Sequence, residues 1–172
     1  LTSHLSSSSP SPLFPALYRL SEDVMTFPQL IQRIDQILDK YGKIRDNASL
    51  ALQRIRTELS RTEGSISRTL NSILRAAQSE GLVDKDASPT LRDGRLVIPV
   101  APAMKRKMRG IVHDESATGK TVFIEPAEVV EANNRVRELE AEERREILRI
   151  LKEFAAQVRP HVKEILASYK FL

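Results

Sequence analysis

The sequence predicts an α+β fold that is mainly helical: a small antiparallel sheet at the tip of a long antiparallel pair of helices, with a short helix near the N-terminus. In two long segments, residues 46–80 and 126–169, apolar residues recur every three or four positions, as on one face of a helix. Only the region between them, residues 90–125, has β-branched runs and turn signals. Helices that leave one compact β unit bury their apolar stripes by packing together, so we expect them to lie antiparallel.

The N-terminal part of the chain divides into a linker and a short helix. Residues 1–12 are rich in Ser and Pro, a composition that predicts a disordered linker. Thr26 is the predicted N-cap of a helix from Phe27 to Lys40, because Pro28 in the first turn has no N–H to leave unsatisfied. Gly42 is predicted to end this helix.

The first long helix is predicted from Asp46, as its N-cap, to Glu80. At about 1.5 Å per residue it would be roughly 50 Å long. Gly64 interrupts it at a cost of about 1 kcal/mol relative to Ala. The positions predicted to face inward are Ala48, Leu52, Ile55, Leu59, Thr62, Ile66, Leu70, Ile73 and Ala77.

The second long helix is predicted over residues 126–169. Pro160 should kink it or begin a new helix, because proline removes a backbone donor. Its inward positions are Val129, Val136, Leu139, Ile147, Ile150, Phe154, Val158, Val162 and Ile165. Opposite charges four residues apart are expected to pair on its polar face, at Glu131–Arg135 and Glu140–Arg144.

Between the helices the turn signals predict a sheet of four short strands. The predicted strands are residues 90–92, 96–100, 110–115 and 121–125. Asp93-Gly94 is a strong signal for a two-residue hairpin. Gly119 is expected in the left-handed conformation in the turn of the second hairpin.

The positive charge is concentrated in this β unit. The chain has a formal net charge of +4, and the segment from residue 92 to 125, with seven basic and four acidic residues, carries +3 of it. The basic residues are the candidate nucleic-acid-binding residues: Arg92, Arg95, Lys105, Arg106, Lys107, Arg109 and Lys120.

Four of these cations fall within five positions, from Lys105 to Arg109. Such a cluster can approach a phosphate backbone without contacting bases. A loop that only keeps the protein soluble has the same composition, so both interpretations stay open on this cluster alone. No aromatic residue is interleaved with the cations, which disfavours stacking on single-stranded bases.

No catalytic, cofactor-binding or metal-binding residues are predicted, so we expect this chain itself not to be an enzyme. The run from Asp114 to Thr121 resembles a phosphate-binding loop, but Asp114 replaces the first glycine and a strand follows instead of a helix. His113, Asp114 and Ser116 should not form a relay, because neighbours on a strand point to opposite faces. The absence of Cys excludes disulfide and thiolate–metal frameworks.

Two further expectations concern where the protein is located and whether it is part of a longer chain. No segment is long and apolar enough to span a bilayer and none resembles a signal peptide, so we expect no membrane partner and a cytoplasmic location. The sequence begins with Leu1 instead of Met, so we expect a piece of a larger protein.

Three motifs stand out in the sequence: DGRLVIPV, then GIVHDESATGKTVFIEPAEVVEANNRVRELEAEE, and upstream GKIRDNASLALQRIR. They resemble the type-two bacterial MutS family, the Smr-containing paralogues of the mismatch-repair ATPase. The resemblance implies a core and first lever helix over residues 13–88, a clamp-like β tip over 89–125, and a second lever helix returning to the core over 126–172.

The resemblance also implies the setting of the parent protein. It would be a homodimer with an ATPase domain that uses ATP and Mg, and an Smr nuclease-type domain. Relatives are described as restraining recombination through branched DNA and as acting on collided ribosomes. The tip would then bind DNA or ribosomal RNA without sequence specificity, coupled to ATP-driven motion. The alternative is a structural and dimerisation lever whose tip contacts protein.

Overall fold

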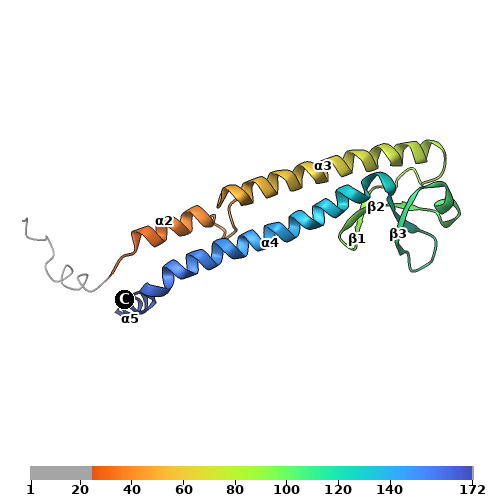
Figure 1. Ribbon diagram of the computed structural model, residues 1–172. Helices are drawn as coiled ribbons and strands as arrows, with labels where there is room; N and C mark the ends of the chain where they lie inside the picture. Colours follow the sequence, from red (N-terminus) through yellow and green to blue (C-terminus); the bar gives the residue numbers. More distant parts are fainter. Residues whose placement is uncertain (1–24, 172) are drawn as a thin grey trace, which may run out of the picture.

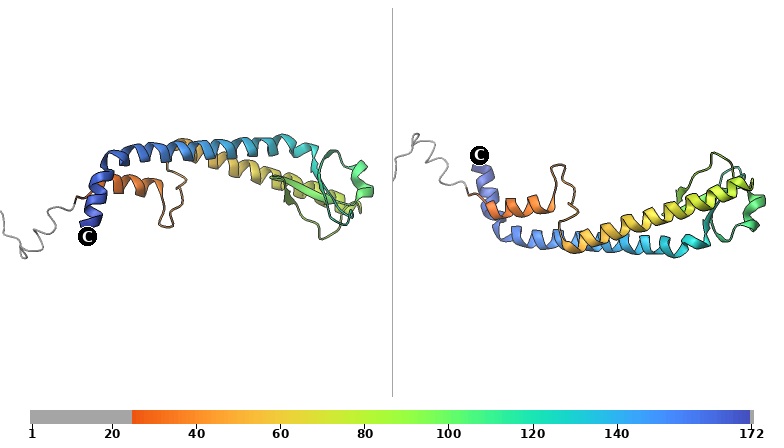
Figure 2. Two further views of the ribbon diagram at one scale, coloured as in Figure 1. Left: turned by 90° about the horizontal axis from the view of Figure 1, so that it is seen from below. Right: turned by 90° about the horizontal axis from the view of Figure 1, so that it is seen from above.

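The structure, a computed structural model, describes residues 25–171. The protein is a long pair of helices with a small sheet at one end (Figure 1). α3 (Leu50–Ser79) and α4 (Val130–Val158) run antiparallel side by side, as all views show (Figures 1 and 2). α2 (Pro28–Ile37) and α5 (Val162–Phe171) lie at the end away from the sheet (Figure 1). The predicted fold class is therefore confirmed. The predicted linker, residues 1–12, lies outside the described residues.

α2 (Pro28–Ile37) is shorter than predicted at its C-terminus by three residues. Its N-cap is the residue after Thr26 and makes no side-chain cap, so the prediction of Thr26 as N-cap was wrong. The helix ends early because the Asp39 carboxylate accepts hydrogen bonds from the backbone N–H groups of Tyr41 and Lys43, at 2.8 and 2.9 Å. A local turn then replaces the helical hydrogen bonds.

α3 begins at Ser49, not at the predicted cap Asp46. Ser49 Oγ accepts a hydrogen bond from the backbone N–H of Leu52 at 3.0 Å and donates one to Glu146 Oε1 on α4 at 2.7 Å. Asp46 lies before the helix, where its carboxylate pairs with the Arg56 guanidinium. The serine thus caps one lever helix and ties it to the other.

The predicted second helix is divided into several pieces. Residue 126 still belongs to β4, and a 3₁₀ turn, η2 (Ala127–Val129), precedes α4. After α4 comes η3 (Arg159–His161), which contains Pro160, and then α5 (Val162–Phe171). Proline therefore begins a new helix, one of the two predicted outcomes. Because the axis changes there, Val162 is 42% exposed, although it was predicted to face inward.

The predicted ion pairs along α4 do not form among the described residues. Arg135 does not bind Glu131. It binds Glu58 of α3 at 2.9 Å and Glu138 and Glu142 of its own helix. Likewise no ion pair joins Glu140 and Arg144. The neighbouring helix offers a better-placed carboxylate than the i−4 position does, so tertiary packing overrides local spacing.

The sheet has four antiparallel strands in the order β1-β2-β4-β3. The strands are β1 (Thr90–Arg92), β2 (Arg95–Val100), β3 (Gly110–Glu115) and β4 (Val122–Pro126), each within one residue of its predicted bounds. Asp93 and Gly94 both have positive φ, 51° and 71°, as a two-residue hairpin with primed geometry requires. Gly119 also has the predicted positive φ, 66°.

Two apolar cores lie at opposite ends of the helical pair. The tip core joins α3 and the start of α4 to one face of the sheet, and its fully buried members include Ile66, Leu70, Ile98, Ile124 and Val129. The base core is smaller and consists of Ile37, Ala48, Leu52 and Ile150. Leu74 is buried in the tip core, although it was not predicted to face inward. The sheet is therefore fixed to the lever by packing and not only by its two connections.

Candidate nucleic-acid interface and the ion cluster behind it

The basic cluster forms a short 3₁₀ helix at the tip, η1 (Pro102–Lys107), followed by Arg109 just before β3. Lys105, Arg106, Lys107 and Arg109 are all exposed. Within residues 25–171 no carboxylate pairs with any of them. Their charge is therefore directed to solvent and is available to an anionic partner.

Two methionines anchor this segment. Met104 and Met108 flank the cations and pack against the tip core as half-buried side chains. A 3₁₀ helix has about three residues per turn, so successive side chains point about 120° apart. Lys105, Arg106 and Lys107 thus project in different directions, an arrangement suited to several phosphates along a backbone instead of one bound anion.

Lys120 is exposed in the turn of the second hairpin. Ser116 N–H donates to the carbonyl of Thr121 at 2.8 Å and closes this turn, and β4 follows directly. The segment that resembles a phosphate-binding loop is therefore a hairpin turn without the following helix. It lacks the helix N-terminus that such loops use to hold phosphate.

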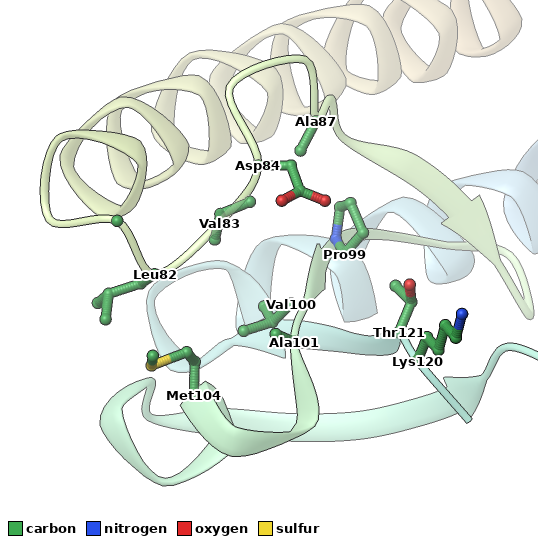
Figure 3. A pocket seen from close by; sticks show the side chains of 11 residues that line it. Leu82, Val83, Asp84, Ala87, Pro99, Val100, Ala101, Met104, Lys120 and Thr121 are labelled. Atoms are coloured by element: carbon green, nitrogen blue, oxygen red, sulfur yellow. The ribbon is translucent and has the colours of Figure 1, made fainter. Parts of the chain in front are cut away.

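A small cavity lies beside this turn, between the end of α3 and the sheet (Figure 3). Its volume is about 140 Å³, and Asp84, Val100, Met104 and Lys120 are among the residues that line it. Small-molecule sites commonly measure about 300–1,000 Å³. The cavity therefore gives no support to a nucleotide site at the hairpin.

Arg92 and Arg95, the other two candidate residues, are engaged within the protein. The Arg92 guanidinium lies over the ring of Phe123, 4.2 Å from its centroid, and pairs with Asp114 at 3.3 Å. Arg95 is 16% exposed and donates to Glu125 at 2.7 Å and to Asn134 at 2.6 Å. Arg95 thus links β2 to Glu125 of β4 and to Asn134 of α4.

Glu125 is the centre of a buried ion cluster that sequence reasoning missed. Its carboxylate is fully buried and lies 2.7 Å from Arg95 Nη1, 2.5 Å from His113 Nε2 and 2.8 Å from Asn133 Nδ2. Burial acts to raise the pKa of Glu125, but the hydrogen bonds from His113, Asn133 and Arg95 outweigh it and hold the pKa below its usual range. A carboxylate in the apolar run VFIEP was the signal in the sequence that could have revealed this site.

His113 is the extra residue of a β-bulge in β3. Val112 pairs with Ile124 and Asp114 pairs with Phe123, so the register shifts by one residue at His113. The argument from strict alternation was therefore wrong, because the bulge lets His113 and Asp114 act on the same side of the sheet. They bind different partners, Glu125 and Arg92, and no hydrogen bond among the described residues joins His113, Asp114 and Ser116 into a relay.

The features of the tip, within the described residues, are exposed, unpaired cations and a buried ion cluster. Among residues 25–171 no three His, Asp or Glu side chains converge as a metal site would require. In the same part of the chain, no helix combines the length and apolar character needed to cross a membrane. The buried cluster holds the sheet on α4. The cations next to Met104 and Met108 are exposed to solvent.

Together these observations define the segment as a long antiparallel helical pair that carries a small basic β unit at one end. Curated proteins named Endonuclease MutS2 match it, among them the following two. The one from Lacticaseibacillus paracasei is 41% identical over 155 residues, which cover 90% of this chain and 20% of that protein. The one from Finegoldia magna is 45% identical over 147 residues, which cover 84% of this chain and 18% of that protein. No family model matches the chain.

The chain matches one segment of MutS2 proteins over most of its own length, and the resemblance described from its motifs is confirmed. It spans about a fifth of the length of the curated relatives it matches.

Proposed function

We propose that the tip binds the phosphate backbone of a nucleic acid, through Lys105, Arg106, Lys107, Arg109 and Lys120. The observation that carries this proposal is the exposure of all five cations without an ion-pair partner among the described residues. Phosphate contacts need only charge and hydrogen-bond donors, so binding would not depend on base sequence. Arg92 could add a contact at the cost of its pair with Asp114, whereas Arg95 is left out because Glu125 holds it.

In the parent protein the helical pair would act as a lever that links the tip to the other domains. Relatives named as endonucleases support a parent with nuclease activity, and the family resemblance supports a homodimer driven by ATP and Mg in a cytoplasmic setting. Two cores joined by cross-helix ion pairs at Arg56–Glu143 and Arg135–Glu58 favour a stiff lever. The partner would be duplex or branched DNA or the RNA of a stalled ribosome.

The test is a charge reversal of the tip. Lys105, Arg106, Lys107 and Arg109 are changed together to Glu in the full-length protein, and binding to branched DNA and to ribosomes is titrated at several salt concentrations. The wild type should lose affinity steeply with salt, at about 0.9 in log–log slope per neutralised phosphate on duplex DNA, and the variant should show weaker and shallower binding. Exposed substitutions usually change stability by less than about 0.5 kcal/mol, so the thermal melt should stay the same.

A matched control carries the same charge change elsewhere. Four exposed cations of α4 serve this purpose when changed to Glu: Arg137, Arg144, Arg145 and Lys152. If the tip variant binds like this control, the tip is not the contact surface. The tip would then contact protein, as in a lever that serves structure and dimerisation.

A further inference from the structure

The outer face of α3 carries a row of arginines. They recur at seven-residue intervals, at Arg54, Arg61, Arg68 and Arg75. Seven residues fall about 20° short of two helical turns, so the row stays on one side of the helix and winds slowly around it. The buried residues of α3, such as Leu52, Ile66 and Leu70, lie on the opposite side, toward α4 and the sheet.

All four arginines are exposed, and among residues 25–171 none of them pairs with a carboxylate. This is not true of Arg56, which lies off the row and binds Asp46 and Glu143. The one acidic residue beside the row, Glu58, is bound by Arg135 from α4. The row thus keeps its full positive charge toward solvent.

The two long helices also differ in their numbers of basic and acidic residues. α3 contains five basic and two acidic residues, whereas α4 contains six basic and seven acidic ones. On α4, Arg149 pairs with Glu146 and Glu153 at the i,i+3 and i,i+4 spacings typical of a solvated face. α4 also carries exposed cations without a partner among the described residues, but they stand among seven acidic residues, whereas only two acidic residues accompany the row on α3. This excess of positive charge on α3 favours an anionic partner.

Gly64 lies on the same face, in the middle of α3. A Cβ there would meet only the end of the Arg68 side chain, at 3.6 Å, so packing within the chain does not require glycine. Glycine inside a helix costs about 1 kcal/mol relative to Ala. Its presence leaves the helix backbone open to close approach, and Ser65 and Ser72 beside it offer hydroxyl groups.

We infer that this face of α3 is a second binding surface for the phosphate backbone of a nucleic acid. At about 1.5 Å per residue the arginines lie about 10 Å apart and span about 31 Å, close to the roughly 34 Å of one duplex turn. Arginine and hydroxyl side chains are common phosphate donors, and arginine binds phosphate through two parallel hydrogen bonds. This surface shares no residue with the tip, so it can be tested independently of the proposed function of the tip.

The experiment compares two neutralised variants of the purified chain. In one, Arg54, Arg61, Arg68 and Arg75 are changed to Gln; in the control, Arg137, Arg144, Arg145 and Lys152 of α4 are changed to Gln. The probe is a labelled mixed-sequence DNA duplex several turns long, with a four-way junction and an RNA duplex as further probes. The α3 variant should lose up to about 3.6 in salt slope, four contacts at about 0.9 each, and the control should lose far less.

A Lys version of the α3 row should retain most of the slope, because the charge remains, and circular dichroism should show unchanged helix content in every variant. Equal slopes for the Gln variant and the control would overturn the inference. So would retention of DNA and RNA binding together with loss of binding to polyglutamate, since the row would then recognise an acidic protein. The tip charge reversal leaves the row intact, so the failure of one surface is distinguishable from the failure of the other.

Discussion

The side-chain amide of Asn133 pairs with the backbone of Leu96 as a neighbouring strand would. Leu96 N–H lies 3.4 Å from Asn133 Oδ1, and Asn133 Nδ2 donates to the Leu96 carbonyl at 3.2 Å. The pairing of β2 with β4 ends at Ile98 and Ile124, and the same register continued by two residues would bring Pro126, which has no N–H to donate, opposite Leu96. The first turns of α4 therefore supply the hydrogen bonds that β4 cannot, and they join the sheet to the lever.

Replacing Asn133 with Ala should destabilise the protein by about 2 kcal/mol. The change leaves the partly buried backbone groups of Leu96 without this partner and removes one of the two donors to Glu125 Oε1, which together cost about 1–3 kcal/mol. The measurement is chemical denaturation. The matched control is Asn71→Ala, an exposed position inside α3 with the same change in helix propensity, and it should lose far less. Equal losses in the two variants would show that the Leu96 contact contributes little.

Glu125→Gln should destabilise the protein in a pH-dependent way. Removing one partner of a buried ion pair costs on the order of 3 kcal/mol, because Arg95 and His113 lose the carboxylate. The pKa of the Glu125 carboxyl is lower in the folded protein than its ordinary value of 4.5. The carboxylate therefore stabilises the folded state fully above about pH 4.5, and this stabilisation is lost as the pH falls through the lower, folded-state pKa. Wild type and variant should therefore converge in stability in acid. Glu131→Gln, an exposed change on α4, is the control, and a constant difference at all pH values would contradict the expectation.

Gly110→Ala should destabilise the tip by about 1–3 kcal/mol, as overpacking does. A Cβ at this position would collide with the carbonyl oxygen of Glu125 and would lie 2.8 Å from Ile124 Cγ2. β3 would have to move away from β4, next to the buried carboxylate. Thermal denaturation and exchange of the amide hydrogens of β4 would both report the change; an unaltered melt would show that β3 shifts freely.

Gly64→Ala should have the opposite effect on stability. Ala favours the helix by about 1 kcal/mol, and the new methyl group meets only the flexible end of Arg68. The variant should melt at a higher temperature and bind duplex DNA less well if the backbone of α3 approaches phosphate there. Higher stability with unchanged binding would limit the nucleic-acid contact to the arginines.

The purified chain should not hydrolyse ATP or cut DNA. The hairpin from Ser116 to Thr121 has no following helix to hold a triphosphate, and ATP turnover is expected only from other domains of the parent. Phosphate release and plasmid cleavage assays on the chain, with Lys120→Ala as the control, test this. Activity that copurifies with the wild type and disappears in the variant would refute it.

Short-range signals in the sequence determined most of the secondary structure. Asp93-Gly94 predicted a hairpin whose two residues have the required positive φ, and Pro160 predicted the point where a new helix begins. Such features depend on a residue and its near neighbours, so the chain's own order specifies them. The long apolar stripes likewise determined that two helices pack as a pair with the sheet at one end.

Only the tertiary structure decided which charges are free. Arg95 and Lys105 look alike in the sequence, yet one binds the buried Glu125, thirty residues away, and the other faces solvent. Tertiary contacts also decided the cap of α3. Asp46 pairs with Arg56 of α3, and Ser49 caps the helix instead. The positions of charged residues in the sequence do not show which residues they will pair with. An ion pair between buried residues far apart in the sequence is also stronger than an ion pair between sequence neighbours in water. The division of the cations between structure and binding therefore appeared only when the chain was folded.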